Sequence, residues 1–265
     1  MKIVSLVSAV DQNIDEMLDG MRLETDAVIV NQCRDVSPGV SVAAPGIKVI
    51  TMNERGVGLS RNTCMDNAPD CDVVLFTDED IMYDGGYSDA ISSEYAAHPE
   101  AEAILFNMRV CEARRTYWNE DFGRVRFYNY GRYPAYSISV KSDVLKESGV
   151  RFPLDFGGGA KYANGEDSIF LHDLLKTGVR IYRSAVCLGE EKERESTWFT
   201  GYDDRFWISR GALYVRLYGA WASFRAHVFL LRHGYMHAET GYGRAYALMK
   251  QGMREVRRTY SERQK

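Results

Sequence analysis

The sequence contains few cysteines, and their spacing does not match a disulfide framework or a zinc site. Only five occur in 265 residues, and none belongs to a Cys-x-x-Cys pair. Structural zinc sites use closely spaced thiols, and disulfide-rich secreted domains use an even set. We therefore predict reduced thiols in a cytoplasmic protein. The cysteines are Cys33, Cys64, Cys71, Cys111 and Cys187.

Long apolar runs are also lacking. No stretch reaches the roughly 18 consecutive apolar residues that a membrane-spanning helix requires. The apolar residues 3–10 are followed by a charged stretch without a cleavage-like site, so they predict a first strand rather than a signal peptide. No spanning helix is expected.

Acidic residues are scarce near the C-terminus. From Arg205 onward, twelve Lys and Arg stand against three Asp and Glu, whereas the preceding residues carry a net charge of −13. This stretch is rich in aromatic residues, and arginines recur at positions 216, 225 and 232, which predicts an amphipathic helix pair. We therefore expect a main domain at 1–204 and a basic, aromatic helical tail at 205–265.

The tail has two interpretations. It packs on its own domain, or it lies at a membrane surface, which would place the protein at the inner face of the membrane. A nucleic-acid partner is not expected, because the basic residues lie in one tail without a recognition motif.

Strand-like and helix-like segments alternate along the first half of the chain. This order predicts an α/β fold with a mostly parallel central sheet flanked by helices. The expected strands are 3–10, 27–30, 47–51, 73–77, 103–110, 135–140 and 179–186. The expected helices are 13–22, 59–67 with Ser60 as the N-cap, 143–148 and 166–175.

The strand expected at 73–77 leads into the consecutive carboxylates Asp78, Glu79 and Asp80. Side chains alternate along a strand, so Asp78 and Asp80 are expected to point to the same side. Ligands bind at the C-terminal edge of such sheets, and oxygen ligands suit Mg²⁺ or Mn²⁺. The pattern predicts a metal–diphosphate site; the alternative is a solvated acidic turn.

A second acidic pair heads the helix expected at 166–175. Glu166 and Asp167 follow a glycine-rich loop at 153–165, whose composition predicts a mobile segment. Acidic residues are common in the first turn of a helix, so simple capping is the alternative to a catalytic role.

Four segments, in this order, resemble the family-2 glycosyltransferases of the GT-A fold, over roughly residues 1–200. They are the first strand at 3–10, Gly58-Leu59-Ser60-Arg61-Asn62, the Asp78-Glu79-Asp80 match to an Asp-x-Asp motif, and Gly165-Glu166-Asp167. The resemblance implies inverting transfer of a hexosyl group from a nucleotide-diphosphate sugar, with a UDP-sugar favoured. The acceptor would be a hydroxyl of a saccharide or of a lipid-linked molecule, in polysaccharide or glycoconjugate biosynthesis.

The resemblance also implies residue roles. Asp167 corresponds to the catalytic base, and Glu166 would bind the acceptor or orient that base. Asp80 would be the direct ligand of Mn²⁺ or Mg²⁺. Asp78 would hold the ribose, the metal or a metal-bound water, and Glu79 would contact the nucleotide sugar. No clear histidine after the late strand completes the metal shell, and residues 190–194 occupy that region, so the third metal ligand is unassigned.

The remaining donor and acceptor contacts are less specific. The amides of Asn31 and Gln32 end the second strand, where the family often has acidic residues, and would read the base. Arg55 and Arg61 would contact the donor phosphate or base, or are surface residues. Trp198 would stack on an acceptor sugar, or anchor the tail.

Two other functions stay open. A sugar nucleotidyltransferase has a related fold, but the residues after the first strand, 11–15, lack its glycine-rich, basic phosphate loop. A non-catalytic nucleotide-sugar-binding protein is the third possibility, although both acidic motifs are present.

Overall fold

The computed structural model of the chain describes residues 1–112, 115–192 and 201–263. These residues form one ten-stranded sheet with the order β3-β4-β2-β1-β5-β9-β7-β10-β6, and β8 pairs with β10. The strands are β1 Ile3–Val10, β2 Asp26–Gln32, β3 Gly39–Ala44, β4 Ile47–Met52, β5 Val73–Asp78, β6 Ile81–Tyr83, β7 Ala103–Arg109, β8 Gly123–Arg124, β9 Ile138–Lys141 and β10 Ile181–Glu191.

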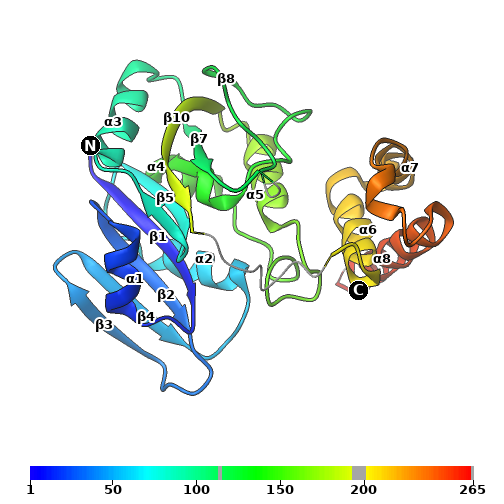
Figure 1. Ribbon diagram of the computed structural model, residues 1–265, viewed down its shortest axis with the longest axis horizontal. Coiled ribbons are helices and arrows are strands. Elements are labelled where there is room, and N and C mark those ends of the chain that lie inside the picture. The colour runs from blue at the N-terminus through cyan, green and yellow to red at the C-terminus, as the bar shows by residue number, and fades with distance from the viewer. Residues whose placement is uncertain (113–114, 193–200, 264–265) are drawn as a thin grey trace.

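The sheet has a parallel half and a mixed half. β4, β2, β1 and β5 run parallel, whereas β9 is antiparallel to its neighbours β5 and β7, and β6 is antiparallel to β10. β1, β2 and β5 are apolar and buried along nearly their whole length, as expected for strands covered on both faces. The predicted α/β class with a helical C-terminal end is confirmed (Figure 1).

Helices cover both faces of the sheet. One core contains side chains of α2, α4 and α5, and the other contains side chains of α1 and α3. The helices are α1 Ile14–Met21, α2 Val57–Asn67, α3 Tyr87–Ala97, α4 Ser142–Ser148, α5 Glu166–Lys176, α6 Asp204–Tyr218, α7 Ala222–Arg232 and α8 Tyr242–Arg263.

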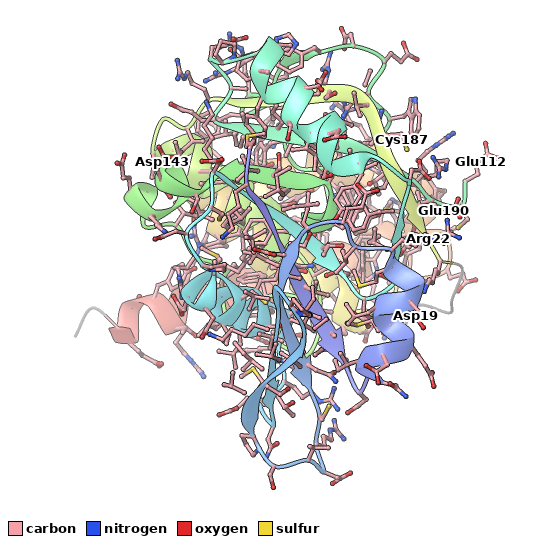
Figure 2. The ribbon with its side chains drawn as sticks, turned by 90° about the vertical axis from the view of Figure 1, so that its left-hand side faces the viewer. Asp19, Arg22, Glu112, Asp143, Cys187 and Glu190 are labelled. Atoms are coloured by element: carbon pink, nitrogen blue, oxygen red, sulfur yellow. The ribbon has the colours of Figure 1, made fainter. Side chains whose placement is uncertain are left out.

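Several element boundaries differ from those expected. Ser60 is not a cap: α2 begins at Val57, and the Ser60 N–H already donates to the Gly56 carbonyl, 3.0 Å away. The strand expected at 135–140 opens with a short 3₁₀ turn at Ala135–Ser137 before β9 begins. β3 and α3 were not predicted; β3 forms a hairpin with β4 that extends from the edge of the sheet (Figure 2).

The C-terminal helices form a third core beside α5 (Figure 1). α6 and α8 approach closely, because a Cβ at Gly211 would lie 2.0 Å from the Met249 carbonyl oxygen and one at Gly252 would lie 1.9 Å from that of Ile208. α6 also contacts α5, so the tail packs on the body. No helix within the described residues is both long and apolar enough to cross a membrane. The domain boundary near residue 204 stays a prediction.

Candidate active site

Helix α2 brings Arg61 beneath the C-terminal edge of the sheet. The helix packs on β1 and β2, and the thiol of Cys64 donates to the Val7 carbonyl at 3.4 Å. Asn62 holds the neighbouring chain through two hydrogen bonds of 2.9 Å with the backbone of Phe152. The Arg61 guanidinium lies over the Phe152 ring, 5.2 Å from its centre. These contacts hold the Arg61 side chain in a buried position, with 4% of its surface exposed.

The acidic turn follows β5 at the same edge. Asp78 is the last residue of β5, and β6 begins at Ile81. The main chain of this turn is held on both sides: the Glu79 N–H donates to the Ser8 carbonyl, and the Lys192 N–H donates to the Asp80 carbonyl at 2.8 Å. Asp80 is buried, unlike a residue of a solvated turn.

The glycine-rich loop brings Glu166 and Asp167 to the same place from the other half of the chain. A Cβ at Gly157 would lie 2.7 Å from the Glu166 carboxyl carbon, and the positive φ of 102° there also favours glycine. The Gly158 carbonyl accepts from the N–H of Val57 at 2.9 Å, and the Ala163 N–H donates to the Ser209 hydroxyl at 3.0 Å. The glycines therefore permit close contact, and hydrogen bonds tie the loop to α2 and α6.

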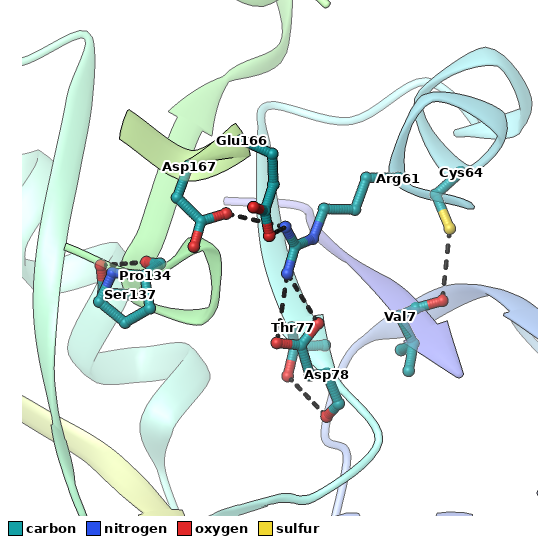
Figure 3. A network of polar contacts seen from close by, with 9 residues as sticks. All are labelled: Val7, Arg61, Cys64, Thr77, Asp78, Pro134, Ser137, Glu166 and Asp167. Atoms are coloured by element: carbon teal, nitrogen blue, oxygen red, sulfur yellow. Dashed lines mark hydrogen bonds and ion pairs between the residues drawn. The ribbon is translucent and has the colours of Figure 1, made fainter. Parts of the chain in front are cut away.

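The guanidinium of Arg61 connects the two acidic motifs (Figure 3). Its Nη1 lies 2.8 Å from Asp167 Oδ1 and 3.4 Å from Glu166 Oε1. Its Nη2 lies 3.1 Å and 3.3 Å from the two carboxylate oxygens of Asp78. One cation therefore holds three carboxylates that are separated by as many as 89 positions in the chain.

This arrangement raises the pKa of both Arg61 and Asp167. Burial alone would lower the pKa of Arg61, but the charges of Asp78, Asp167 and Glu166 outweigh it and raise that pKa, so the guanidinium stays charged. Burial and the neighbouring Glu166 charge raise the pKa of Asp167 to about 8, against the opposing effect of Arg61. A carboxyl with a raised pKa is suited to accepting a proton near neutral pH.

These residues line a cavity of about 290 Å³ at the C-terminal edge of the sheet, which we call the acidic cavity. Among the described residues, its charged lining consists of six carboxylates and one arginine, and Gln32 and Tyr136 also contribute. The charged residues are Arg61, Asp78, Glu79, Asp80, Glu166, Asp167 and Glu191. The structure thus brings most of the expected site residues together around one space.

Asn31, Gln32 and Arg55 have structural partners. The Asn31 side chain accepts from the Gln12 N–H and donates to the Gln12 carbonyl, at 3.1 and 2.8 Å. The Gln32 amide donates to the Glu54 carbonyl at 2.8 Å. Arg55 forms an ion pair of 2.5 Å with Asp11. Of the three, Gln32 lines the acidic cavity, and the donor-binding roles stay predictions.

Trp198 lies outside the described residues, so its expected acceptor contact stays a prediction. Tyr202, four positions later in the sequence, lines a second cavity, of about 490 Å³, which meets the acidic cavity at Asp167. This second cavity was not predicted, because its walls come from residues 116–134, from the glycine-rich loop and from α6. Nothing in the sequence shows that these segments meet.

The donor atoms of the acidic cavity fit a hard divalent cation. Within the described residues, no three His, Cys, Asp or Glu side chains are arranged as a complete metal site. However, Asp78 and Asp80 line the same space, and Mg²⁺ commonly takes one or two carboxylates together with phosphate oxygens and water. Glu191, within the segment where sequence analysis left the third ligand unassigned, also lines this cavity. Antiparallel pairing of β10 with β6 brings it opposite Ile81.

Comparisons with known proteins show the fold. No family model and no curated protein matches the sequence. Among solved structures, S. aureus TarS 1-349 in complex with UDP-GlcNAc is similar, with a TM-score of 0.59 and 15% identity over 90% of this chain and 74% of that one. Mannosyltransferase PcManGT from Pyrobaculum calidifontis, in complex with GDP-Man and Mn²⁺, gives a TM-score of 0.53 and 16% identity over 96% and 74%. The chain therefore has a GT-A-type glycosyltransferase fold.

Proposed function

We propose that this protein is a metal-dependent, inverting glycosyltransferase. The observation that carries the proposal is the acidic cavity, in which the carboxylates after β5 and those heading α5 meet around one space. The fold supports it, since two proteins with this fold are known in complex with UDP-GlcNAc and with GDP-Man and Mn²⁺. The donor is a nucleotide-diphosphate sugar, with a UDP-sugar favoured, and the acceptor is a saccharide or lipid-linked hydroxyl.

In this mechanism Asp167 is the catalytic base. It accepts the proton of the acceptor hydroxyl as the oxygen attacks the anomeric carbon, opposite the departing diphosphate, and the configuration therefore inverts. Glu166 raises the basicity of Asp167 through its like charge and orients it or the acceptor. The proton ends on Asp167, and the nucleoside diphosphate leaves with the bonding electrons.

Asp80 and Asp78 would hold Mn²⁺ or Mg²⁺. Such an ion, when bound, supplies positive charge that stabilises the leaving diphosphate. Arg61 already pairs with Asp78, so the guanidinium provides a fixed positive charge at the same edge of the cavity. The binding of a cation and a diphosphate would then redistribute the partners of Arg61 among the carboxylates.

A thermal-shift experiment tests the donor site. UDP-GlcNAc, GDP-mannose and the free diphosphates are added with and without Mn²⁺ to the wild type, Asp80→Asn and the control Asp19→Asn. Asp19 is an exposed carboxylate on α1, labelled in Figure 2. We expect one nucleotide to raise the melting temperature only with Mn²⁺, in the wild type and Asp19→Asn but not in Asp80→Asn. Stabilisation without metal, or retained in Asp80→Asn, would contradict the metal site.

Measuring diphosphate release separates an enzyme from a nucleotide-sugar-binding protein. A transferase should release nucleoside diphosphate when a donor and a suitable acceptor are both present, and Asp167→Asn, which lacks the proposed base, should release far less. Binding without any release, over a panel of acceptors, would favour the non-catalytic function.

The contact of the tail with a membrane belongs to the same proposal. Trp221, Phe224 and Leu231 are 71%, 59% and 75% exposed, and all lie on α7 or immediately before it. Exposed aromatic and aliphatic side chains beside arginines are suited to an anionic lipid surface. Co-sedimentation with phosphatidylglycerol vesicles, compared for the wild type and Trp221→Ser/Phe224→Ser, tests it; equal sedimentation of both would oppose it.

A further inference from the structure

The second cavity continues away from the acidic cavity along the C-terminal helices. It shares Pro134, Asn164, Gly165 and Asp167 with the acidic cavity. It also shares Gly131, Arg132, Ser168, Arg210 and Leu213 with a third cavity, of about 280 Å³. These two cavities form a continuous groove that begins at Asp167, and we call it the arginine groove.

The arginine groove has the opposite charge to the acidic cavity. It is lined by Arg132, Arg210 and Arg225, and Asp167 at its entrance is the single carboxylate among its described lining residues. None of the three arginines forms an ion pair within the part of the chain that the structure describes. Elsewhere in the molecule many arginines do, including Arg61, Arg109 and Arg216.

Aromatic rings hold these three guanidinium groups in place. The guanidinium carbon of Arg210 lies 5.1 Å from the ring centre of Phe206 and 5.1 Å from that of Phe229. The Nε atom of Arg210 is buried and has no hydrogen-bond partner among the described residues. Arg132 and Arg225 lie over the rings of Tyr133 and Tyr218, at 5.3 and 4.8 Å.

Guanidinium groups that form no ion pair and lie over aromatic rings are suited to binding an oxyanion. Guanidinium forms bidentate, charge-assisted hydrogen bonds with phosphate and carboxylate, and less conformational entropy is lost when the group is already fixed. The groove also presents exposed rings, since Phe127 and Tyr128 are 54% and 81% exposed. Such rings offer flat apolar faces on which sugar rings can stack.

We propose that the arginine groove binds the acceptor and selects acceptors that carry an oxyanion, either a phosphate or a carboxylate, next to the reacting hydroxyl. The inference rests on the proposed function for the role of Asp167, which lies where the groove meets the acidic cavity. Arg210 and Arg132 are the specificity-determining residues, and Arg225 extends the positive charge to a longer anionic acceptor.

A binding experiment with matched sugars tests the groove without turnover. Isothermal titration measures the affinity of the full-length protein for octyl β-glucoside, its 6-phosphate and octyl β-glucuronide. We expect both anionic glycosides to bind at least about tenfold more tightly than the neutral one, the ratio expected for a charge-assisted hydrogen bond. The phosphate and carboxylate arms identify which oxyanion is preferred. Raising the ionic strength should weaken only the anionic glycosides.

Substitutions of single arginines show which residues produce the preference for anionic glycosides. Arg132→Gln and Arg210→Gln should each remove most of the preference for the anionic glycosides, whereas Arg254→Gln, an exposed arginine of α8 outside the groove, should not. Arg132 is exposed, so its variant is expected to fold normally. Arg210→Lys keeps the charge and should retain part of the preference.

Two results would overturn the proposal. The first is that anionic and neutral glycosides bind equally, or that neither binds. The second is a preference for anionic glycosides that remains in both Arg132→Gln and Arg210→Gln. UDP–Mn²⁺ binding is measured on the same samples by thermal shift. A normal anionic preference without UDP binding would refute the proposed function and leave the groove as an oxyanion site. UDP binding without the preference would refute the groove alone.

Discussion

The two cavities that meet at Asp167 are built from opposite chemistry. Among the described residues, the acidic cavity is lined by six carboxylates and by Arg61, which is paired with three of them. The arginine groove has three arginines without ion pairs among the described residues and one carboxylate, Asp167 itself. The oxygen-rich lining of the first suits a cation, and the guanidinium groups of the second suit an anion.

This difference gives direction to the reaction that we propose. A cation and a diphosphate satisfy the acidic cavity, and an anionic acceptor satisfies the arginine groove. If the two substrates exchanged places, the anionic acceptor would approach the carboxylates of the acidic cavity, and like charges in a partly buried site repel strongly. In this proposal the charge of each cavity distinguishes the donor from the acceptor, independently of contacts with sugar hydroxyls.

Asp167→Asn should have the largest effect, because it removes the proposed base where the two cavities meet. The acceptor hydroxyl would have no group to take its proton, so we expect kcat to fall about 10²- to 10⁴-fold. UDP–Mn²⁺ binding should be unchanged, because the variant removes a negative charge that does not belong to the expected metal ligands. Steady-state kinetics and a thermal shift on the same preparation measure both. A loss of less than threefold would mean that another group is the base.

Arg61→Met should destabilise the fold through the acidic cavity alone. Removing the cation leaves Asp78, Glu166 and Asp167 close together and partly buried, and losing one partner of a buried ion pair costs about 3–5 kcal/mol. Urea denaturation measures the free energy of unfolding. Arg225→Met, in the groove, should change it by less than about 1 kcal/mol, because Arg225 is exposed and has no carboxylate to leave behind. Equal losses in the two variants would contradict the contrast between the cavities.

Gly211→Ala should destabilise the protein through the wall of the groove. Its Cβ would lie 2.0 Å from the carbonyl oxygen of Met249, so α6, which carries Arg210, must shift away from α8. Overpacking of this kind costs about 1–3 kcal/mol. Gly243→Ala, in the first turn of α8 with open space around it, should leave the stability unchanged or raise it by about 0.4–1 kcal/mol.

The same two variants also test the groove by function. Gly211→Ala should weaken the binding of octyl glucoside 6-phosphate while UDP–Mn²⁺ binding is retained, because no residue of α6 lines the acidic cavity. Equal stability of Gly211→Ala and Gly243→Ala would contradict the close approach of α6 and α8 at Gly211.

The sequence predicts the acidic cavity much better than the arginine groove, and the reason is physical. Asp78 and Asp80 follow a buried strand and Asp167 begins a helix, so local periodicity places both motifs at element ends, where parallel α/β folds bind ligands. The approach of Glu166 to Arg61 depends on close contacts of glycines in the loop at 153–165. No local sequence pattern predicts those contacts.

The groove depends on tertiary packing throughout. Arg210 and Phe206 are one helical turn apart and were within reach of a sequence argument, but Phe229 belongs to another helix and Arg132 to an irregular segment. Helix α3 was missed although Tyr87, Ile91 and Tyr95 recur at helical spacing and are buried. Strand β3 was also missed, and its residues are mostly exposed, so it has no buried face.

The smallest predicted effect is a shift in pH dependence, and it tests whether the carboxylates of the acidic cavity influence one another. Burial and the Glu166 charge raise the pKa of Asp167 to about 8. A base acts only when ionised, so activity should fall as the pH drops through that value. Glu166→Gln removes the like charge, lowers the pKa of Asp167 and moves this acidic limb to lower pH. The exposed control Glu16→Gln should leave the limb in place.

Stability provides a second measure of this pKa that does not require turnover. The folded protein binds the Asp167 proton more tightly than the unfolded chain does, so the free energy of unfolding should decline as the pH rises from the ordinary pKa of an aspartate towards about 8. Glu166→Gln should make that decline smaller, and Asp167→Asn should remove it. Urea denaturation at pH 5 and pH 9 measures the difference. Glu166→Gln could leave both the acidic limb of the activity profile and the decline in unfolding free energy unchanged. Glu166 would then not act on Asp167, and the raised pKa of Asp167 would be due to burial alone.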